Sequence, residues 1–316
     1  MIAKVTTIDL DAKVTQLHPE KVLPDLPRAF TLAEFLALKI PPREMMLGPI
    51  IAERSIKMIF APRGVGKTRL AYGMAGALAT ATGFLKWKAE RPRRVLIVDG
   101  ELPGTVLQER LRHAIADLDN RSYAETHIRI VPSDLFERGL PDLATVEGQE
   151  ALDPLIGDAE LIILDNVSTL IRSGKENEAE SWGRMQEWLL AQRRAGRSTL
   201  LLHHAGRNGE SRGTSKREDV MDTIVRLTNP SDYQPSEGTR FTMEFTKSRS
   251  VMGTDVESLE VSLNAGQWAW LPITDVRANR IIALHSEGLS QREIATDLGT
   301  SLGTVNRTLK AAKDAA

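Results

Sequence analysis

The residue pattern that most clearly predicts chemistry in this 316-residue chain lies at positions 61–69. Gly64 and Gly66 allow backbone N–H groups to turn inward around a phosphate, and the start of a following helix adds positive potential. Lys67 can reach the outer phosphates of a nucleoside triphosphate, and the Thr68 hydroxyl can bind Mg²⁺. The predicted nucleotide-binding residues are Ala61, Pro62, Arg63, Gly64, Val65, Gly66, Lys67, Thr68 and Arg69.

The flanking sequence supports this phosphate-binding loop. Lys57–Phe60 reads as a short strand directly before it, and an apolar run rich in small residues follows it. A strand, a glycine-rich loop and a helix are the context that such a loop requires. A chance match is the alternative, and Ala61 stands where a first glycine is more usual.

An acidic residue ends a second apolar run. Leu161–Asp165 reads Leu-Ile-Ile-Leu-Asp, which is typical of a strand whose terminal carboxylate holds Mg²⁺ through its water shell. The alternative is an aspartate that caps whatever follows a buried strand. With the phosphate loop upstream, the pattern favours Thr68 and Asp165 as metal-binding residues.

Two further acids follow the run Arg94–Val98, in the order Asp99-Gly100-Glu101. A carboxylate at this place can accept the proton of a water that attacks the γ-phosphate. Glu101 is the preferred base, Asp99 is the competing candidate, and both could instead be structural.

A pair of histidines, His203 and His204, follows the apolar run Ser198–Leu202. A polar side chain there can bind the γ-phosphate and transmit its loss to the loop that follows, and His204 is the preferred sensor. The pair could instead bind a metal ion, but the nearby sequence supplies no spaced third ligand.

Short apolar runs that alternate with amphipathic segments must position these residues. This order predicts an α/β fold with a mostly parallel, twisted sheet, whose carboxyl edge gathers the candidate groups. The predicted strands are Lys57–Phe60, Arg94–Val98, Ile128–Val131, Leu161–Leu164, Ser198–Leu202 and Arg240–Thr246. The predicted helices are Thr68–Ala79, Thr105–Leu118 and Glu180–Ala195.

Together these segments resemble the RecA-like P-loop ATPases, specifically the plasmid RepA-type hexameric helicase group of mobile elements. The resemblance covers about Gly48–Trp270 and includes Arg212–Ser215, Asp222–Arg226 and Phe245–Arg249. It implies a RecA-like fold, ATP and Mg²⁺ as cofactors, and a homo-oligomer, expected to be a hexameric ring with ATP at the subunit interfaces.

In that family an arginine of the neighbouring subunit stabilises the transferring phosphate. Lys247 and Arg249 match the Lys-x-Arg pair of the broader DnaB-type replicative helicases, while Arg226 matches the RepA-type arginine. Both matches are present, so the identity of this arginine stays open. Each of these residues could instead form a surface salt bridge.

The resemblance also places two loops, Arg172–Glu178 and Gly206–Arg217, at a central channel that binds single-stranded DNA. The second loop has four basic residues and three glycines, which suit contacts to phosphates. It has no aromatic residue for base stacking, so binding should be mainly electrostatic and sensitive to salt. The alternative is a solvated loop. The predicted DNA-binding residues are Arg207, Arg212, Lys216 and Arg217.

The C-terminal residues have a purely helical pattern. Val276–Glu287 predicts one helix, Ser290–Glu293 is a capping box that opens a second, and Val305 and Leu309 share one face of a third. Residues 288–295 and 303–305 resemble the helix-turn-helix of bacterial response regulators and sigma factors. Such a module implies binding to duplex DNA.

The helix-turn-helix resemblance would place residues 302–310 in the major groove. Six basic and five acidic residues in 275–316 leave little net charge, and such modules also bind proteins, so a protein partner is the alternative. The predicted DNA-binding residues of this module are Thr304, Asn306, Arg307 and Lys310.

The chain is expected to comprise an N-terminal arm (1–45), a RecA-like ATPase domain (46–272) and a small all-α helix-turn-helix domain (275–316). The arm is rich in proline and has one predicted helix, Thr31–Leu38, with Thr31 and Glu34 as its capping box.

Composition narrows the function classes. A hydrophobic content of 41% and a charged content of 26% are those of ordinary globular domains. A net charge of −1 excludes a global basic field, so DNA contacts must be local. The absence of cysteine excludes disulfides and thiolate chemistry and fits a cytoplasmic protein. No membrane association is expected, because the longest uncharged run, Leu70–Leu85, is shorter than the roughly 20 residues that cross a bilayer.

The main functional hypothesis is an oligomeric Mg-ATP-driven DNA helicase or translocase. The alternative is a DNA-bound regulator or loader, in which ATP controls assembly on DNA without unwinding. A nucleotide-binding recombination mediator is a third possibility.

Overall fold

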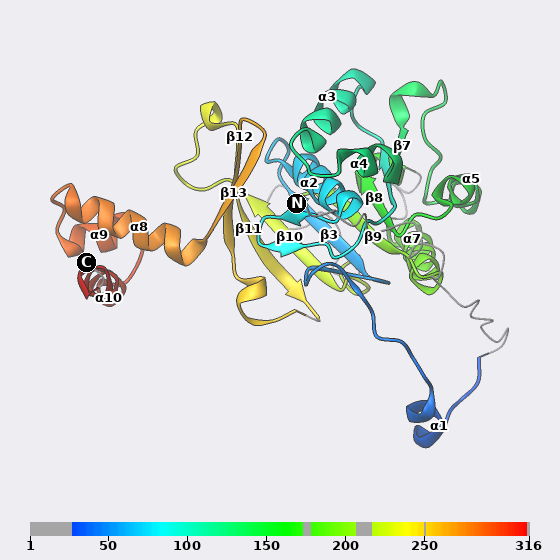
Figure 1. The fold of residues 1–316 in the computed structure, drawn as a ribbon, viewed down its shortest axis with the longest axis horizontal. Helices are drawn as coiled ribbons and strands as arrows, with labels where there is room; N and C mark the ends of the chain where they lie inside the picture. The colour runs from blue at the N-terminus through cyan, green and yellow to red at the C-terminus, as the bar shows by residue number, and fades with distance from the viewer. Residues whose placement is uncertain (1–26, 173–177, 207–216, 250, 315–316) are drawn as a thin grey trace, which may run out of the picture. The chain divides into compact units, whose positions relative to one another are not determined.

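The computed structural model describes residues 27–172, 178–206, 217–249 and 251–314 (Figure 1). The chain divides into two compact units, Met1–Pro42 and Arg43–Ala316. In the described part of the first unit, helix α1 spans Leu32–Ala37. The Thr31 hydroxyl accepts a hydrogen bond from the Glu34 N–H, and the Glu34 carboxylate accepts one from the Thr31 N–H. The predicted capping box is therefore confirmed.

A nine-stranded sheet organises the second unit, in the order β13-β12-β11-β10-β3-β9-β8-β6-β7. All neighbours from β10 to β7 are parallel, and β11 to β13 add antiparallel pairs at the other side (Figure 1). The parallel strands are β3 Ile56–Ala61, β6 Val95–Asp99, β7 Ile128–Pro132, β8 Leu161–Asp165, β9 Ser198–His204 and β10 Thr223–Thr228. The antiparallel strands are β11 Thr239–Ser248, β12 Leu259–Asn264 and β13 Gln267–Pro272. The predicted α/β fold with a mostly parallel sheet is confirmed.

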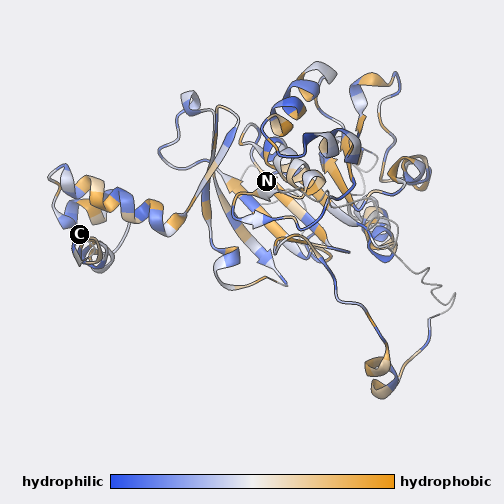
Figure 2. Cartoon of the chain, viewed as in Figure 1, coloured by the Kyte–Doolittle hydropathy of each residue, from blue (hydrophilic) through white to orange (hydrophobic). Residues whose placement is uncertain are grey.

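Helices cover both faces of the parallel strands, because alternate residues of a strand face opposite sides. Ile59 and Ile163 pack with α2 and α3 on one face, whereas Met58 and Ile162 pack with α5, α6 and α7 on the other. Figure 2 shows the strands between them as largely hydrophobic. The helices are α2 Lys67–Thr80, α3 Gly104–Ile115, α4 Arg121–His127, α5 Val146–Ile156, α6 Val167–Leu170 and α7 Glu178–Arg194.

Short elements complete this unit. Strand β1 pairs with β2, and β4 pairs with β5, each in antiparallel fashion. Their bounds are β1 Met45–Leu47, β2 Ile51–Ala52, β4 Gly83–Phe84 and β5 Trp87–Lys88. Single 3₁₀ turns occur at Ser133–Leu135, Pro235–Glu237 and Gly253–Val256. These elements add local hairpins and turns to the nine-stranded sheet.

Three helices follow β13: α8 Ile273–Ser286, α9 Gln291–Asp297 and α10 Leu302–Asp314. Their interior is a small cluster of Ile281, Leu284, Ile294 and Val305. Ser290 and Glu293 form the predicted capping box at the start of α9. Three C-terminal helices are thus present, while the division into three domains stays a prediction. Among the described residues, no helix is both long and apolar enough to cross a membrane.

Candidate active site

The phosphate-binding loop connects the end of β3 at Ala61 to the start of α2 at Lys67. Gly64 has φ +82° and Gly66 has φ +124°, conformations that side-chain-bearing residues rarely adopt. A Cβ at Gly66 would also lie 2.9 Å from the Thr239 Cγ2 atom. Both the backbone geometry and the close approach of β11 therefore require glycine here.

Lys67 lies inside this loop rather than in solvent. Its ammonium group donates to the carbonyl oxygens of Ala61 and Pro62 and contacts Nδ1 of His204, each at 3.2 Å. Burial lowers the pKa of Lys67, and the acids Asp165 and Glu101 oppose this shift. The amine is held at the mouth of the loop, where it can reach a bound phosphate.

The other loop residues have distinct surroundings. Pro62 and Arg63 are exposed, and Val65 is buried. Arg69 is half-buried on α2 and lines a pocket of about 540 Å³ together with Tyr72 and Trp268. Of the two basic side chains at positions 61–67, Lys67 is therefore buried inside the loop and Arg63 is exposed.

Thr68 and Asp165 form the second part of the site. The Thr68 hydroxyl donates to Oδ2 of Asp165 at 2.6 Å, across the gap between α2 and the end of β8. Burial raises the pKa of the Asp165 carboxyl to about 7, and the Thr68 hydrogen bond opposes that rise. A hydroxyl and a carboxylate oxygen are the hard ligands that Mg²⁺ prefers, so these residues fit the predicted ion.

The two acids after β6 differ in their surroundings. The Asp99 side chain is fully buried, and its Oδ1 accepts hydrogen bonds from the backbone N–H groups of Glu101 and Leu102, at 3.0 and 2.8 Å. Its Oδ2 accepts the Tyr72 hydroxyl at 2.8 Å. Glu101 is exposed at the same strand end. Asp99 is therefore engaged in holding the turn, whereas the Glu101 side chain lies at the exposed edge.

His204 connects these groups at the end of β9. Its Nδ1 lies 3.2 Å from the Lys67 ammonium, and its Nε2 lies 3.5 Å from the Glu101 carboxylate. Burial, followed by the nearby Lys67 charge, lowers the pKa of His204. His203 is buried and instead contacts Arg217, 3.3 Å away. The two histidines have different partners, and no group of three His, Asp or Glu able to hold a metal occurs among the described residues.

One residue of this site, Asn166, is not among those predicted from the sequence. Asn166 directly follows Asp165, is buried, and donates through Nδ2 to the Glu101 carboxylate. The same Nδ2 lies 3.2 Å from Nε2 of His204. Its position one residue beyond a strand-ending acid was the available signal.

Comparison with known proteins agrees with this geometry. The AAA domain family matches residues 19–210, which is more than half of the chain. The chain belongs to this family. No curated protein matches it in sequence.

Solved structures resemble the AAA domain in fold. A KaiC-like protein from the hyperthermophilic archaeon Pyrococcus horikoshii OT3 has a TM-score of 0.52 and 14% identity, over 72% of this chain and 94% of that one. A RadB recombinase has a TM-score of 0.48 and 14% identity, over 68% and 90%. At 14% identity the likeness to the KaiC-like protein concerns the fold alone, which is RecA-like.

The three candidate neighbour-contacting cations of this AAA protein lie on or beside β10 and β11. Arg226 forms an ion pair with Glu244, with Nη2 and Oε2 2.6 Å apart. Lys247 and Arg249 donate from their side chains to the backbone carbonyls of Glu218 and Asp219. The partners given above for these three side chains are therefore Glu244, Glu218 and Asp219. The structure thus gathers the loop, the two acids and His204, but not these three.

The predicted DNA-binding residues are only partly described. Arg207, Arg212 and Lys216 lie outside the described residues. Arg217 lies over the Trp182 ring, 5.6 Å from its centroid, in addition to its contact with His203. It is therefore packed against the protein near the histidine pair.

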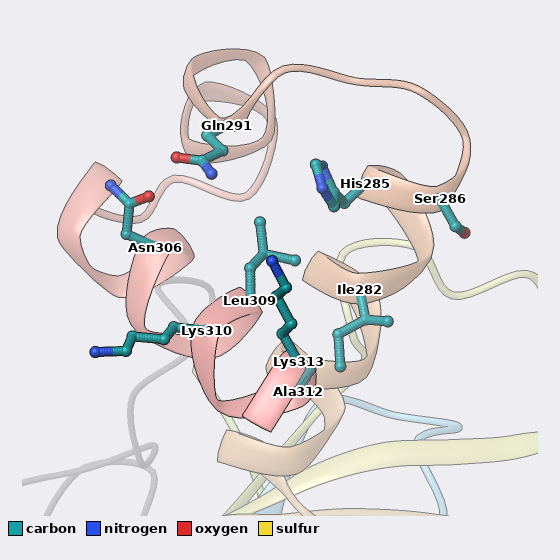
Figure 3. A pocket seen from close by; sticks show the side chains of 9 residues that line it. All are labelled: Ile282, His285, Ser286, Gln291, Asn306, Leu309, Lys310, Ala312 and Lys313. Atoms are coloured by element: carbon teal, nitrogen blue, oxygen red, sulfur yellow. The ribbon is translucent and has the colours of Figure 1, made fainter. Parts of the chain in front are cut away.

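The C-terminal candidates lie on one helix of the AAA protein. Asn306, Arg307 and Lys310 are exposed on α10, and Thr304 is half-buried. Asn306, Lys310 and Lys313 of α10 line a pocket of about 550 Å³ together with Gln291 of α9 and His285 of α8 (Figure 3).

Proposed function

We propose that this chain is an oligomeric, Mg-ATP-hydrolysing motor acting on DNA, a RepA-type helicase or translocase of a plasmid, phage or integrated element. The observation that carries the ATPase part is the convergence of Lys67, Asp165 and Glu101 at the carboxyl edge of one parallel sheet. Asp99 and Asp165 are register partners on β6 and β8, so the loop after β6 emerges beside the predicted metal ligand.

In this proposal each residue of the site has a separate role in phosphoryl transfer. The backbone N–H groups of 64–67 and the Lys67 ammonium bind the triphosphate, and Thr68 and Asp165 hold Mg²⁺. The ion neutralises charge that develops on the phosphates. Glu101 accepts the proton of the attacking water. His204 contacts both Lys67 and Glu101, and so would respond when the γ-phosphate leaves.

Arg249 is the proposed residue that reaches the neighbour's phosphate. Its side chain is exposed and is bound to a backbone carbonyl, whereas Arg226 is paired with the Glu244 carboxylate. Releasing a carbonyl contact costs less than breaking an ion pair at this close distance.

Mixed oligomers test this inter-subunit role. Arg249→Ala subunits mixed with Lys67→Ala subunits should recover part of the ATPase activity, because one interface then carries an intact loop and an intact arginine. The matched comparison is a mixture of Arg226→Ala subunits with Lys67→Ala subunits. Absence of recovery for Arg249 with recovery for Arg226 would transfer the role to Arg226.

Contacts to DNA are proposed at two places. Residues 206–217 begin two residues after His204, so single-stranded DNA bound by them would contact a segment that is close in the sequence to the proposed γ-phosphate sensor. The exposed Asn306, Arg307 and Lys310 on α10 suit the major groove of a duplex. Because such a module can also recruit without unwinding, an ATP-switched DNA-binding regulator or loader is the alternative function.

A strand-displacement assay on forked DNA separates the two functions. The motor should unwind the fork with ATP and Mg²⁺, and the Lys67→Ala protein should not, because it lacks the phosphate-binding amine. ATPase activity stimulated by single-stranded DNA without unwinding of any forked substrate would support the regulator instead. Particle mass measured with a non-hydrolysable ATP analogue and single-stranded DNA would test the ring.

A further inference from the structure

The oxygen and the nitrogen of the Asn166 side-chain amide have different partners. Asn166 lies at the carboxyl end of β8, is 1% exposed and caps helix α6. Its Oδ1 accepts the backbone N–H of Ser168 at 2.9 Å. Because an amide oxygen can only accept, this bond assigns the orientation of the amide and turns the Nδ2 donor toward the active site.

At that end, the Nδ2 group donates to Oε2 of Glu101. His204 approaches the same carboxylate oxygen, with Nε2 3.5 Å away. Since the Lys67 ammonium can only donate, Nδ1 of His204 accepts from it, and the neutral ring carries its proton on Nε2. Both the imidazole N–H and the amide N–H therefore face one oxygen of Glu101.

The two chain segments that carry Glu101 and Asn166 are pressed together. The Gly100 N–H donates to the Asp165 carbonyl oxygen at 2.6 Å. A Cβ at Gly100 would lie 2.5 Å from the Thr169 hydroxyl oxygen of α6. This close approach sets the spacing at which the Asn166 amide meets the Glu101 carboxylate.

Glu101 needs such an anchor. Its side chain is 43% exposed and has several rotatable bonds, so without an anchor it would populate many rotamers. A general base must lie within hydrogen-bonding reach of one particular water. Anchoring one carboxylate oxygen leaves the other free to accept that water's proton.

We propose that Asn166 is a positioning residue for ATP hydrolysis, which holds the Glu101 carboxylate from the end of the neighbouring strand while its own oxygen caps α6. This inference rests on the proposed role of Glu101 as the base. The capping role alone uses only Oδ1 and gives no reason for an amide nitrogen at this position.

The test removes the amide nitrogen of Asn166 and keeps an oxygen that can cap α6. Asn166→Ser and Asn166→Thr both keep an oxygen that caps a helix well, but their shorter side chains lack the amide nitrogen that reaches the Glu101 carboxylate. Each should lower kcat by about 10- to 100-fold, up to the loss expected when a reacting group is misplaced by about 1 Å. The KM for ATP and the Tm should stay near those of the unaltered protein. Ser168→Ala, at an exposed neighbouring side chain, is the matched control and should change nothing.

A double substitution identifies the residue through which Asn166 acts. In a Glu101→Gln background, adding Asn166→Ser should cause no further loss of kcat, because the base is already absent. A further loss, an unchanged kcat in both single variants, or a fall in Tm or a rise in KM that accounts for the lost activity would overturn the proposal. If Glu101→Gln itself hydrolyses ATP normally, the base assignment fails and takes this inference with it. If Glu101→Gln is inactive and Asn166→Ser is normal, only the positioning role fails.

Discussion

At the scale of single residues, the contrast between Asp99 and Glu101 shows how one strand end can hold a structural acid beside the proposed base. Asp99 has no exposure, and both of its oxygens accept hydrogen bonds that fix the turn after β6. Glu101, two residues later, reaches the exposed edge. A buried carboxylate with satisfied oxygens gives the backbone rigidity, and the exposed one is left for chemistry.

This contrast predicts that Asp99→Asn destabilises the protein by about 1–3 kcal/mol, because an amide replaces one acceptor oxygen with a donor that faces another donor. Tyr72→Phe removes only the hydroxyl bond and should cost about 1 kcal/mol. Urea unfolding of the two variants provides the measurement. A Glu101→Gln protein serves as the comparison and should unfold like the unaltered chain. Equal stability of all three would show that Asp99 does not hold the turn.

The sequence was sufficient to locate the strand-ending groups of the site, because position after a buried strand fixes the edge at which a side chain emerges. That reasoning places Lys67, Asp165, Glu101 and His204 at one edge. It preferred Glu101 but left Asp99 open as the competing base, and it did not find Asn166. Both depend on which oxygen a neighbouring N–H or hydroxyl occupies, and that is decided by tertiary packing.

At the scale of elements, helix α2 shows why the residues after the loop are small. A Cβ at Gly73 would lie 2.3 Å from the Phe84 ring, and one at Gly76 would lie 2.7 Å from Leu118. Phe84 is itself held against Trp268, with ring centroids 5.3 Å apart. The phosphate-binding helix therefore approaches the β4–β5 hairpin and the segment after α3 more closely than side-chain-bearing residues would permit.

Glycine substitutions in two helices test this packing. Gly73→Ala should destabilise the protein by about 1–3 kcal/mol, since overpacking against rigid rings outweighs the gain in helix propensity. Gly183→Ala in α7 is the matched control, because no described atom lies within 4 Å of its added Cβ. It should stabilise by about 0.5–1 kcal/mol. Thermal unfolding of both variants measures the sign of each change in stability. A stabilising Gly73→Ala would show that the β4–β5 hairpin can shift to make room for the added methyl group.

The elements themselves were predictable to different degrees. All six predicted strands are present, because short apolar runs between turn residues are strong signals. Strand β10 and the β12–β13 hairpin were not among the predictions. In β13, half-buried and exposed residues alternate, and Ala265 and Gly266 form the turn with φ +49° and +84°. Ala-Gly is a weaker hairpin signal than Asn-Gly. The hairpin therefore depends on the pairing of β12 with β11, which the sequence pattern does not show.

At the scale of the whole molecule, the sheet contains a charge that the fold accommodates poorly. Lys57 of β3 is 7% exposed, and its ammonium donates to the Thr223 hydroxyl at 3.1 Å. The nearby Asp222 carboxylate already accepts from the Ile56 N–H at 2.8 Å and from Arg193 at 2.6 Å. Burial lowers the pKa of Lys57 from its ordinary 10.5 to about 8, and Asp222 only partly opposes the shift.

This pKa sets the sign of the contribution that Lys57 makes to the pH dependence of stability. Between about pH 8 and 10.5 the unfolded chain binds a proton at Lys57 that the folded chain does not, so this contribution to the free energy of unfolding should rise with pH across the window. Below pH 8 both states are protonated and the full cost remains. Lys57→Met, which keeps the length but not the charge, should therefore be more stable than the unaltered protein by about 1–3 kcal/mol at pH 7. The advantage should vanish near pH 10.5.

Urea unfolding at a series of pH values measures this difference in stability. The exposed Lys88→Met variant is the control and should show no such pH window. A Lys57→Met protein that is less stable at every pH would mean that attraction to Asp222 outweighs the cost of burying the ammonium group.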